Sequence, residues 1–319
     1  MERKLGDIGE FALIEELKAR AFAGRGTVVG IGDDAAVIEP PADGMLLLFT
    51  TDMLVEGTHF DLSTAPPYLV GRKAIACSLS DIAAMGGMPR AAVVSLGAPG
   101  GLGVEFCREL YRGMDEIARR FDCGIAGGDT VGSAAGLVVS VAMIGEVERG
   151  RLALRSGARA GDGLWVTGRL GGSIAGRHLS FTPRVAEARF LVERFPVKAM
   201  MDLSDGLGSD LFRMAGASSA GFRLCGERIP VDREAIGEAD AETALRRALY
   251  DGEDFELLAA IDPSCDDAAL RRDFGARFDC GITRIGTVTG KGHGVTIAAP
   301  EGERPIREGG FGHFGGGRA

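Results

Sequence analysis

Apolar residues along the first half of the chain follow two different periods, which predict a mixture of helices and strands. Residues 9–22 and 104–121 repeat apolar side chains at helical spacing. Pro67 opens a further predicted helix over residues 67–85, which a Gly-Gly pair ends. Short, wholly apolar runs between these helices predict buried strands at 45–52, 91–96 and 136–146.

The second half continues the same mixture after a charged, glycine-containing stretch at 146–162, which is typical of a crossing between domains. We therefore expect an N-terminal domain over 1–148 and a C-terminal domain over 149–319. Helices and strands that mix without strict alternation favour an α+β fold (α/β mixed) over a doubly wound sheet. The strands predicted in this half cover 163–168, 255–261, 282–288 and 295–298, and the helices cover 184–195 and 207–217.

Composition narrows the class of protein. The 319 residues suffice for two ordinary domains, and the 50 glycines indicate many tight turns or close backbone approaches. A net charge of -9 argues against nucleic acid or an anionic membrane as partner. The six cysteines lack C-x-x-C spacing, and we find neither a secretory segment nor an apolar run long enough for a bilayer. We expect a cytoplasmic protein.

Carboxylates recur beside glycines or at the ends of predicted elements. Any one of them is explained as a turn or a helix cap, because Asp and Gly are common turn residues. Taken together, carboxylates on rigid element ends are the donors that hard cations prefer, which indicates a site for several Mg²⁺ ions. These acids are Asp33, Asp34, Asp52, Asp81, Asp129, Asp202, Asp205, Asp251, Glu253 and Asp254.

The stretch "VGIGDDAAVI" resembles a dinucleotide-binding turn, but its context differs. A strand-like segment follows it where that motif needs a helix, so we interpret it as a false match. Asp33 and Asp34 would repel a pyrophosphate unless Mg²⁺ lay between them. Motifs of P-loop enzymes, protein kinases, serine hydrolases and zinc proteases are absent from the sequence. Of four histidines, His59 is either a structural residue or a catalyst.

Nine motifs occur in the order seen in thiamine-monophosphate kinases, and the chain resembles that family from Gly9 to Phe314. The motifs are "GEFALI", "GIGDDAAVI", "TTDMLVEGTHF", "GRKAIACSLSDIAAMGGMPRAAVVSLGAP", "GGDTV", "LRSGARAGD", "MDLSDGL", "YDGEDFELL" and "GFGHF". The resemblance implies a two-domain aminoimidazole-ribonucleotide synthetase-like fold, with an N-terminal ATP/metal-binding domain and a C-terminal α/β domain. It also implies a homodimer, with ATP and several Mg²⁺ ions in a cleft between domains.

The same resemblance implies roles for individual residues. Mg²⁺ would be bound by Asp34, Thr51, Asp52, Asp81, Asp129 and Asp202, with support from Thr50 and a further ion at Asp205. ATP would lie against Tyr111, Gly128, Asp129, Arg155 and Ser204. The acceptor, thiamine monophosphate, would contact His59, Glu253 and Phe311. Tyr111 is equally explained by packing on its own helix. Phe311 stands where the family usually has Trp, and the 176–201 segment is shorter than usual, so both features bear on the choice of acceptor.

The implied reaction is direct transfer of the ATP γ-phosphoryl group to thiamine monophosphate. A phosphate monoester is largely dianionic at pH 7, so it needs no general base and no side chain is expected to act as one. Three alternatives remain. The chain could be another ATP-dependent enzyme of the superfamily acting on a different small phosphorylated substrate, or a nucleotide-binding homologue without kinase activity. It could also be a kinase for an alcohol, with His59 as general base.

Overall fold

The computed structural model describes residues 16–22, 24, 27–29, 37–38, 42–299 and 302–311. The chain divides into two compact units. The first unit contains Met1–Ile82 and Gly87–Arg149, and the second contains Gly150–Ala319 together with Ala83–Gly86. Among the described residues, no helix has both the length and the apolar character needed to cross a membrane.

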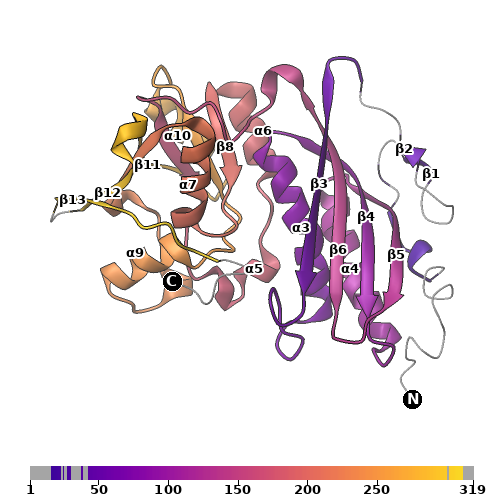
Figure 1. Cartoon of the computed structure of the whole chain (residues 1–319). Coiled ribbons are helices and arrows are strands. Elements are labelled where there is room, and N and C mark those ends of the chain that lie inside the picture. Colours follow the sequence, from indigo (N-terminus) through magenta and orange to yellow (C-terminus); the bar gives the residue numbers. More distant parts are fainter. Residues whose placement is uncertain are drawn as a thin grey trace. The chain divides into compact units, whose positions relative to one another are not determined.

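The first unit is built on a four-stranded sheet with the strand order β3-β6-β4-β5 (Figure 1). Only β4 and β5 run parallel, while the other neighbours are antiparallel. A short antiparallel pair, β1 (Thr27–Val29) and β2 (Val37–Ile38), precedes the sheet. The elements of the sheet layer are β3 (Met45–Val55), α3 (Pro67–Ala84), β4 (Met88–Ala98), α4 (Val104–Arg120), β5 (Gly124–Gly132) and β6 (Val138–Glu148).

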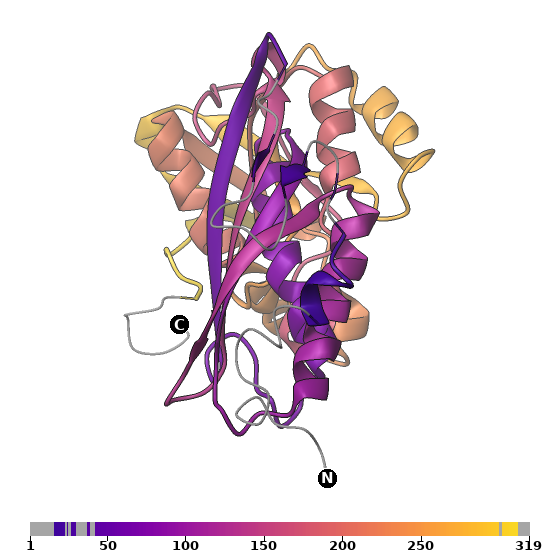
Figure 2. The same ribbon diagram turned by 90° about the vertical axis from the view of Figure 1, so that its right-hand side faces the viewer.

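Helices α3 and α4 lie together on one face of this sheet (Figure 2). Two glycines let the helices approach until their backbones touch. A Cβ atom on Gly71 of α3 would lie 1.9 Å from the carbonyl oxygen of Leu110, and one on Gly113 of α4 would lie 1.9 Å from that of Tyr68. Helix α3 also packs closely on β6, because a Cβ on Gly145 would lie 2.8 Å from Ile82. These contacts fix α3 over the centre of the sheet.

The opposite face of the sheet carries exposed apolar side chains. Phe49 is 73% exposed and Met53 is 56% exposed, while Val131 on the far edge strand is 56% exposed. Strand alternation places these residues on the face that α3 and α4 leave uncovered. The helix-facing positions of the same strands, such as Val94 and Val141, are buried. We call this exposed surface the open sheet face.

The second unit is built on a seven-stranded sheet with the order β13-β12-β9-β11-β7-β10-β8. Strands β7 and β10 are buried at every position, as in a sheet covered on both faces. The strands are β7 (Gly163–Thr167), β8 (Val197–Asp202), β9 (Gly221–Cys225), β10 (Leu257–Ile261), β11 (Ile282–Thr289), β12 (Val295–Ala299) and β13 (Gly302–Pro305). The helices are α5 (Arg177–Ser180), α6 (Val185–Arg194), α7 (Leu207–Ser218), α8 (Arg233–Ile236), α9 (Ala241–Tyr250) and α10 (Asp267–Gly275).

Helix α7 packs on one face of this sheet, where Leu211 and Met214 join a buried cluster with Leu164. Helix α10 covers Trp165 on the other face, with the Arg271 guanidinium 5.0 Å from the centre of the indole ring. Mixed sheets and helices in both units confirm the expected α+β fold. Of the helix expected over 9–22, the described residues 16–18 are helical.

Candidate active site

Two carboxylates face each other between the sheet and helix α3 of the first unit. Asp52 lies on β3 and Asp81 lies on α3. The Thr50 hydroxyl donates to Oδ2 of Asp81 at 2.5 Å, and the Ser78 hydroxyl donates to Oδ2 of Asp52 at 2.6 Å. Thr50 and Asp52 are two residues apart on one strand, so both side chains turn to the helix face. The structure therefore brings Thr50, Asp52 and Asp81 together.

Electrostatics make this acid pair suitable for a cation. Burial and the neighbouring Asp81 charge raise the pKa of Asp52 to about 6, against the smaller opposing effect of the Ser78 hydrogen bond. A divalent cation would offset both the cost of burying the Asp52 charge and its repulsion from Asp81. Carboxylate and hydroxyl oxygens are ligands that suit Mg²⁺. Within the described part of the chain, no group of three or more His, Cys, Asp or Glu residues is arranged to hold a metal ion. Asp34, the remaining acid implied for this site, lies outside the described residues.

Asp129 and Thr51 lie elsewhere on the sheet. The strand register aligns Met53 with Ser140, Ser140 with Ser95, and Ser95 with Asp129, so Asp129 belongs to the open sheet face. Two strands separate β5 from β3, which at the usual strand spacing is about 14 Å between their axes. Within one chain, Asp129 therefore does not reach the Asp52–Asp81 pair.

Thr51 is exposed and alternates with Asp52 along β3, so its side chain lies on the open sheet face as well. In the strand register Asp52 aligns with Val141, Val141 with Val94, and Val94 with Gly128, so Gly128 belongs to the helix-facing side of the sheet. A Cβ atom at Gly128 would lie 2.0 Å from the Val94 carbonyl oxygen, so only glycine allows β4 and β5 to approach this closely. The glycine is therefore required by the sheet itself.

His59 is held in a defined orientation at the end of β3. The backbone N–H of Val55 donates to Nδ1 of His59 at 3.0 Å. The ammonium group of Lys73, fully buried in α3, donates to the His59 carbonyl oxygen at 3.0 Å. Because Nδ1 accepts a hydrogen bond, the neutral ring carries its proton on Nε2. His59 therefore presents an N–H donor at Nε2 and is poorly suited to accept a proton there.

Tyr111 lies in a small cavity of about 90 Å³ that is separate from the acid pair. Burial raises the pKa of the Tyr111 hydroxyl, so the phenol stays neutral. The cavity is lined by Leu17, Arg20, Ala21, Arg108, Tyr111, Arg112, Asp115 and Ile125. Nucleotide contact at Tyr111 stays a prediction beside the packing interpretation.

In the second unit, main-chain hydrogen bonds gather residues that are far apart in the sequence. Asp202, which is buried, ends β8, and Ser204 and Asp205 follow it after Leu203. The N–H of Glu253 donates to the Ser204 carbonyl at 2.7 Å, and the N–H of Phe311 donates to the Asp205 carbonyl at 3.2 Å. The structure thus brings Glu253 and Phe311, the acceptor residues that the resemblance implies in this unit, to the loop after β8. That loop carries Ser204 and Asp205, which the resemblance implies for ATP and metal binding.

Asp205 already has a cationic partner. Arg213 forms an ion pair with Asp205, and its Nη1 atom also donates to the buried Asp210 at 2.7 Å. Burial and the Asp205 charge raise the pKa of Asp210 to about 7, while Arg213 and the more distant Arg155 oppose this shift. Arg155 is therefore close enough to this cluster to act on its charge. A metal ion at Asp205 would have to share that carboxylate with Arg213.

Comparison with known proteins assigns the class. The family model for the AIR synthase related protein N-terminal domain matches residues 32–147, and the model for the C-terminal domain matches residues 156–298. Solved structures of the hydrogenase maturation protein HypE, such as the E. coli protein at 23% identity and a TM-score of 0.75, share the fold. The chain is thus an AIR synthase related protein with both domains of that class.

More similar relatives narrow the assignment. Thiamine-monophosphate kinase from Rhodopirellula baltica is 39% identical over 88% of this chain and 90% of the relative. The Bacillus subtilis enzyme is 34% identical over 96% and 99%. The crystal structure from Stenotrophomonas maltophilia K279a has a TM-score of 0.78 at 30% identity, over 91% of this chain and 96% of that one. A ThiL protein complexed with AMPPCP and TMP has a TM-score of 0.73 at 30% identity, over 98% and 99%. The chain belongs to the thiamine-monophosphate kinase family.

Proposed function

We propose that this chain transfers the γ-phosphoryl group of ATP to the phosphate of thiamine monophosphate, giving thiamine diphosphate and ADP. The observation that carries the proposal is the match to thiamine-monophosphate kinases over nearly the whole of both chains. The clustering of Ser204, Glu253 and Phe311 in the second unit supports it.

The chemistry of the acceptor fits the side chains present. A phosphate monoester is already a nucleophile at neutral pH and does not need a general base. The Nε2–H donor of His59 suits a phosphate oxygen, whereas an alcohol acceptor would need a base at that place. The geometry at His59 therefore favours the phosphate acceptor over the alcohol alternative.

The main obstacle is repulsion between two anionic substrates, about 4 kcal/mol for unit charges 4 Å apart at an effective dielectric of 20. We propose Mg²⁺ as the metal, held by Asp52 and Asp81 with Asp34, and supported by Thr50. When bound, Mg²⁺ supplies charge neutralisation between phosphate groups. The role of the protein is to fix the carboxylates, and the Thr50 and Ser78 hydroxyls do so.

The remaining residue roles follow from the family. ATP phosphates would lie against Gly128, Asp129, Arg155 and Ser204, with Tyr111 near the nucleotide, and Asp202 and Asp205 would serve further metal ions. His59, Glu253 and Phe311 would contact thiamine monophosphate. Phenylalanine at 311 can stack on an aromatic ring as tryptophan does, with a weaker cation–π interaction.

A homodimer is part of this proposal. The open sheet face exposes Phe49, Met53 and Val131, and exposed apolar patches of this kind mark interaction sites. Asp129 lies on the same face, at the opposite edge of the sheet from β3. A second copy seated on this face would cover the apolar residues and lie against Asp129. A cytoplasmic location fits the six free thiols, and a partner other than nucleic acid fits the net charge of -9.

The direct test is a coupled ADP-release assay with Mg·ATP that compares thiamine monophosphate, thiamine and no acceptor, with the product identified by mass. We expect ADP and thiamine diphosphate only with thiamine monophosphate. ADP formation with thiamine as acceptor would favour an alcohol kinase. An inactive protein that still binds ATP would favour the non-catalytic alternative.

A further inference from the structure

The backbone around Glu253 adopts a conformation that residues with side chains avoid. Glu253 has a φ of 59° and Phe255 has a φ of 51°, so both lie in the left-handed region. Such a conformation persists only where the surrounding contacts over-determine it, and it is concentrated at functional sites. The contacts that impose it here can be named.

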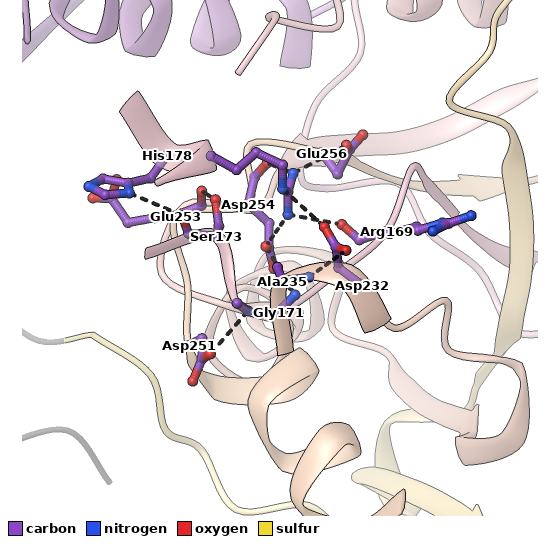
Figure 3. A network of polar contacts seen from close by, with 12 residues as sticks. Arg169, Gly171, Ser173, His178, Asp232, Ala235, Asp251, Glu253, Asp254 and Glu256 are labelled. Carbon is purple, nitrogen blue, oxygen red and sulfur yellow. Dashed lines mark hydrogen bonds and ion pairs between the residues drawn. The ribbon is translucent and has the colours of Figure 1, made fainter. Parts of the chain in front are cut away.

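Asp254, between these two residues, is the anchor of the segment. Its side chain is 1% exposed, and both carboxylate oxygens accept the N–H of Gly171 at 3.0 Å. Nη2 of Arg177 donates to Oδ1 of the same carboxylate at 2.8 Å (Figure 3). Gly171 has a φ of 85° and its Cβ would lie 2.8 Å from the N atom of Ala248, so glycine is required there.

Arg177 connects Asp254 to two further segments. Its Nη2 atom donates to the Arg169 carbonyl oxygen at 3.2 Å, and its Nε atom lies 3.3 Å from Oδ2 of Asp232. Its Nη1 atom is 3.4 Å from the Asp254 carbonyl oxygen. One guanidinium group therefore connects the turn after β7, the start of α8 and the strained segment. Figure 3 shows Arg169, Asp232 and Asp254 of these three segments in one polar network.

The main chain on both sides of Asp254 is also fixed. The Ser173 hydroxyl donates to the Glu253 carbonyl at 2.6 Å, while the Glu253 N–H is bonded to Ser204. The Phe255 ring stacks on Phe181 with the ring centres 4.1 Å apart. Both peptide groups of Glu253 are thus held in place, which restricts where its carboxylate can lie.

We propose that Arg177 and Asp254 are positioning residues for the phosphoryl acceptor: the ion pair of Arg177 with the buried Asp254 carboxylate holds the left-handed backbone at Glu253 and so fixes where the Glu253 carboxylate meets the acceptor. The inference rests on the proposed function, in which Glu253 contacts thiamine monophosphate. That acceptor carries a cationic thiazolium and an amino group on its pyrimidine, and a fixed carboxylate binds such groups with less loss of entropy.

The test compares Arg177→Met with Arg284→Met in the full-length protein. Both arginine side chains are 28% exposed, and both lie 2.8 Å from an aspartate oxygen, but Arg284 pairs with Asp267 away from the strained segment. For Arg177→Met we expect the KM for thiamine monophosphate to rise about tenfold or more, while the KM for ATP changes less than about twofold. Arg284→Met should change neither. Arg177→Lys keeps the charge without the planar fork and should fall between wild type and Arg177→Met.

Hydrogen exchange of the amides in residues 251–256 supplies a measurement independent of turnover. It should become faster in Arg177→Met and stay unchanged in Arg284→Met. Unchanged exchange, or an unchanged KM for thiamine monophosphate in an active Arg177→Met enzyme, would overturn the inference and leave the proposed function intact. Absence of thiamine monophosphate-dependent ADP formation in the wild type would instead overturn the proposed function.

Discussion

The backbone N–H of Val55 and the Nδ1 atom of His59 form a hydrogen bond of 3.0 Å that decides the protonation pattern of the imidazole ring. With Nδ1 engaged as acceptor, the neutral ring keeps its proton on Nε2. His59 is therefore a donor toward the acceptor phosphate, and its expected contribution is to binding.

Replacement of His59 tests this role. We expect His59→Ala to raise the KM for thiamine monophosphate by roughly 10- to 100-fold, the usual effect of a lost hydrogen bond to a charged group. The value of kcat should fall much less. His59→Gln, whose amide N–H can replace Nε2–H, should retain more affinity than His59→Ala. Steady-state kinetics with varied acceptor check both. A large loss of kcat at unchanged KM would point to a general base and an alcohol acceptor.

The acid pair predicts how the metal-free protein responds to pH. The pKa of Asp52 is raised to about 6 from its ordinary 3.8, so the folded state holds this proton more tightly than the unfolded state. The contribution of Asp52 to the free energy of unfolding of the metal-free protein should therefore fall as pH rises from about 4 to about 6 and then level off. Urea denaturation in the presence of EDTA, repeated across this pH range, measures the trend.

Asp81→Asn removes the Asp81 charge, which is one of the two causes of the raised pKa of Asp52. At pH 8 we expect it to stabilise the metal-free protein by about 1 kcal/mol, the equivalent of roughly one pKa unit. The same variant should lose most of the rise in Tm that Mg²⁺ gives the wild type. Asp43→Asn, at an exposed loop position, is the control and should behave as wild type. Unchanged stabilisation of Asp81→Asn by Mg²⁺ would exclude Asp81 as a ligand.

The open sheet face predicts an oligomeric contact. Phe49→Asp places a charge at its most exposed apolar position and should shift the protein from dimer to monomer. Light scattering coupled to size-exclusion chromatography measures the mass. Leu154→Asp, at a 42% exposed apolar residue of the second unit, should leave the mass unchanged. A wild-type protein that is already monomeric would contradict the dimer proposal.

The contact between α3 and α4 predicts a strong effect at Gly71. An added methyl group would meet the Leu110 carbonyl at 1.9 Å, so Gly71→Ala must separate the helices. We expect a loss of about 2–4 kcal/mol in the free energy of unfolding, as for other overpacked sites. Gly216→Ala, in α7 with no neighbouring atom within 4 Å, should instead be neutral or stabilising by up to about 1 kcal/mol. Chemical denaturation of both variants provides the comparison.

Elements with strong periodicity were predicted well, while several in the second half were missed. Helix α4 and strand β6 match their apolar patterns within two residues. Strand β8 was missed because its six residues include Lys198 and follow Pro196 directly. Helix α9 begins at the Asp240 side chain, which accepts the Thr243 N–H at 2.8 Å. That capping pattern was present in the sequence and could have revealed the helix.

For the candidate site, the sequence supplied the residue types and the family, because the motifs around Asp52, Asp81 and Glu253 are local and occur in a fixed order. For Asp254 the sequence offered only a turn residue or one member of the acids that indicate a metal site. Its contacts with Gly171 and Arg177 join segments that no local pattern connects. The residue types around Glu253 likewise do not indicate its positive φ.

The sequence by itself determined the family, the mixed fold and the carboxylates available for metal binding, since these depend on local patterns and on motif order. The tertiary structure decided which of these groups meet. Strand order and alternation put Asp52 with Asp81 on the helix face and Asp129 on the other face, with two strands between β3 and β5. A side chain's face and its distance across a sheet depend on long-range pairing, which the chain acquires only when the strands come together.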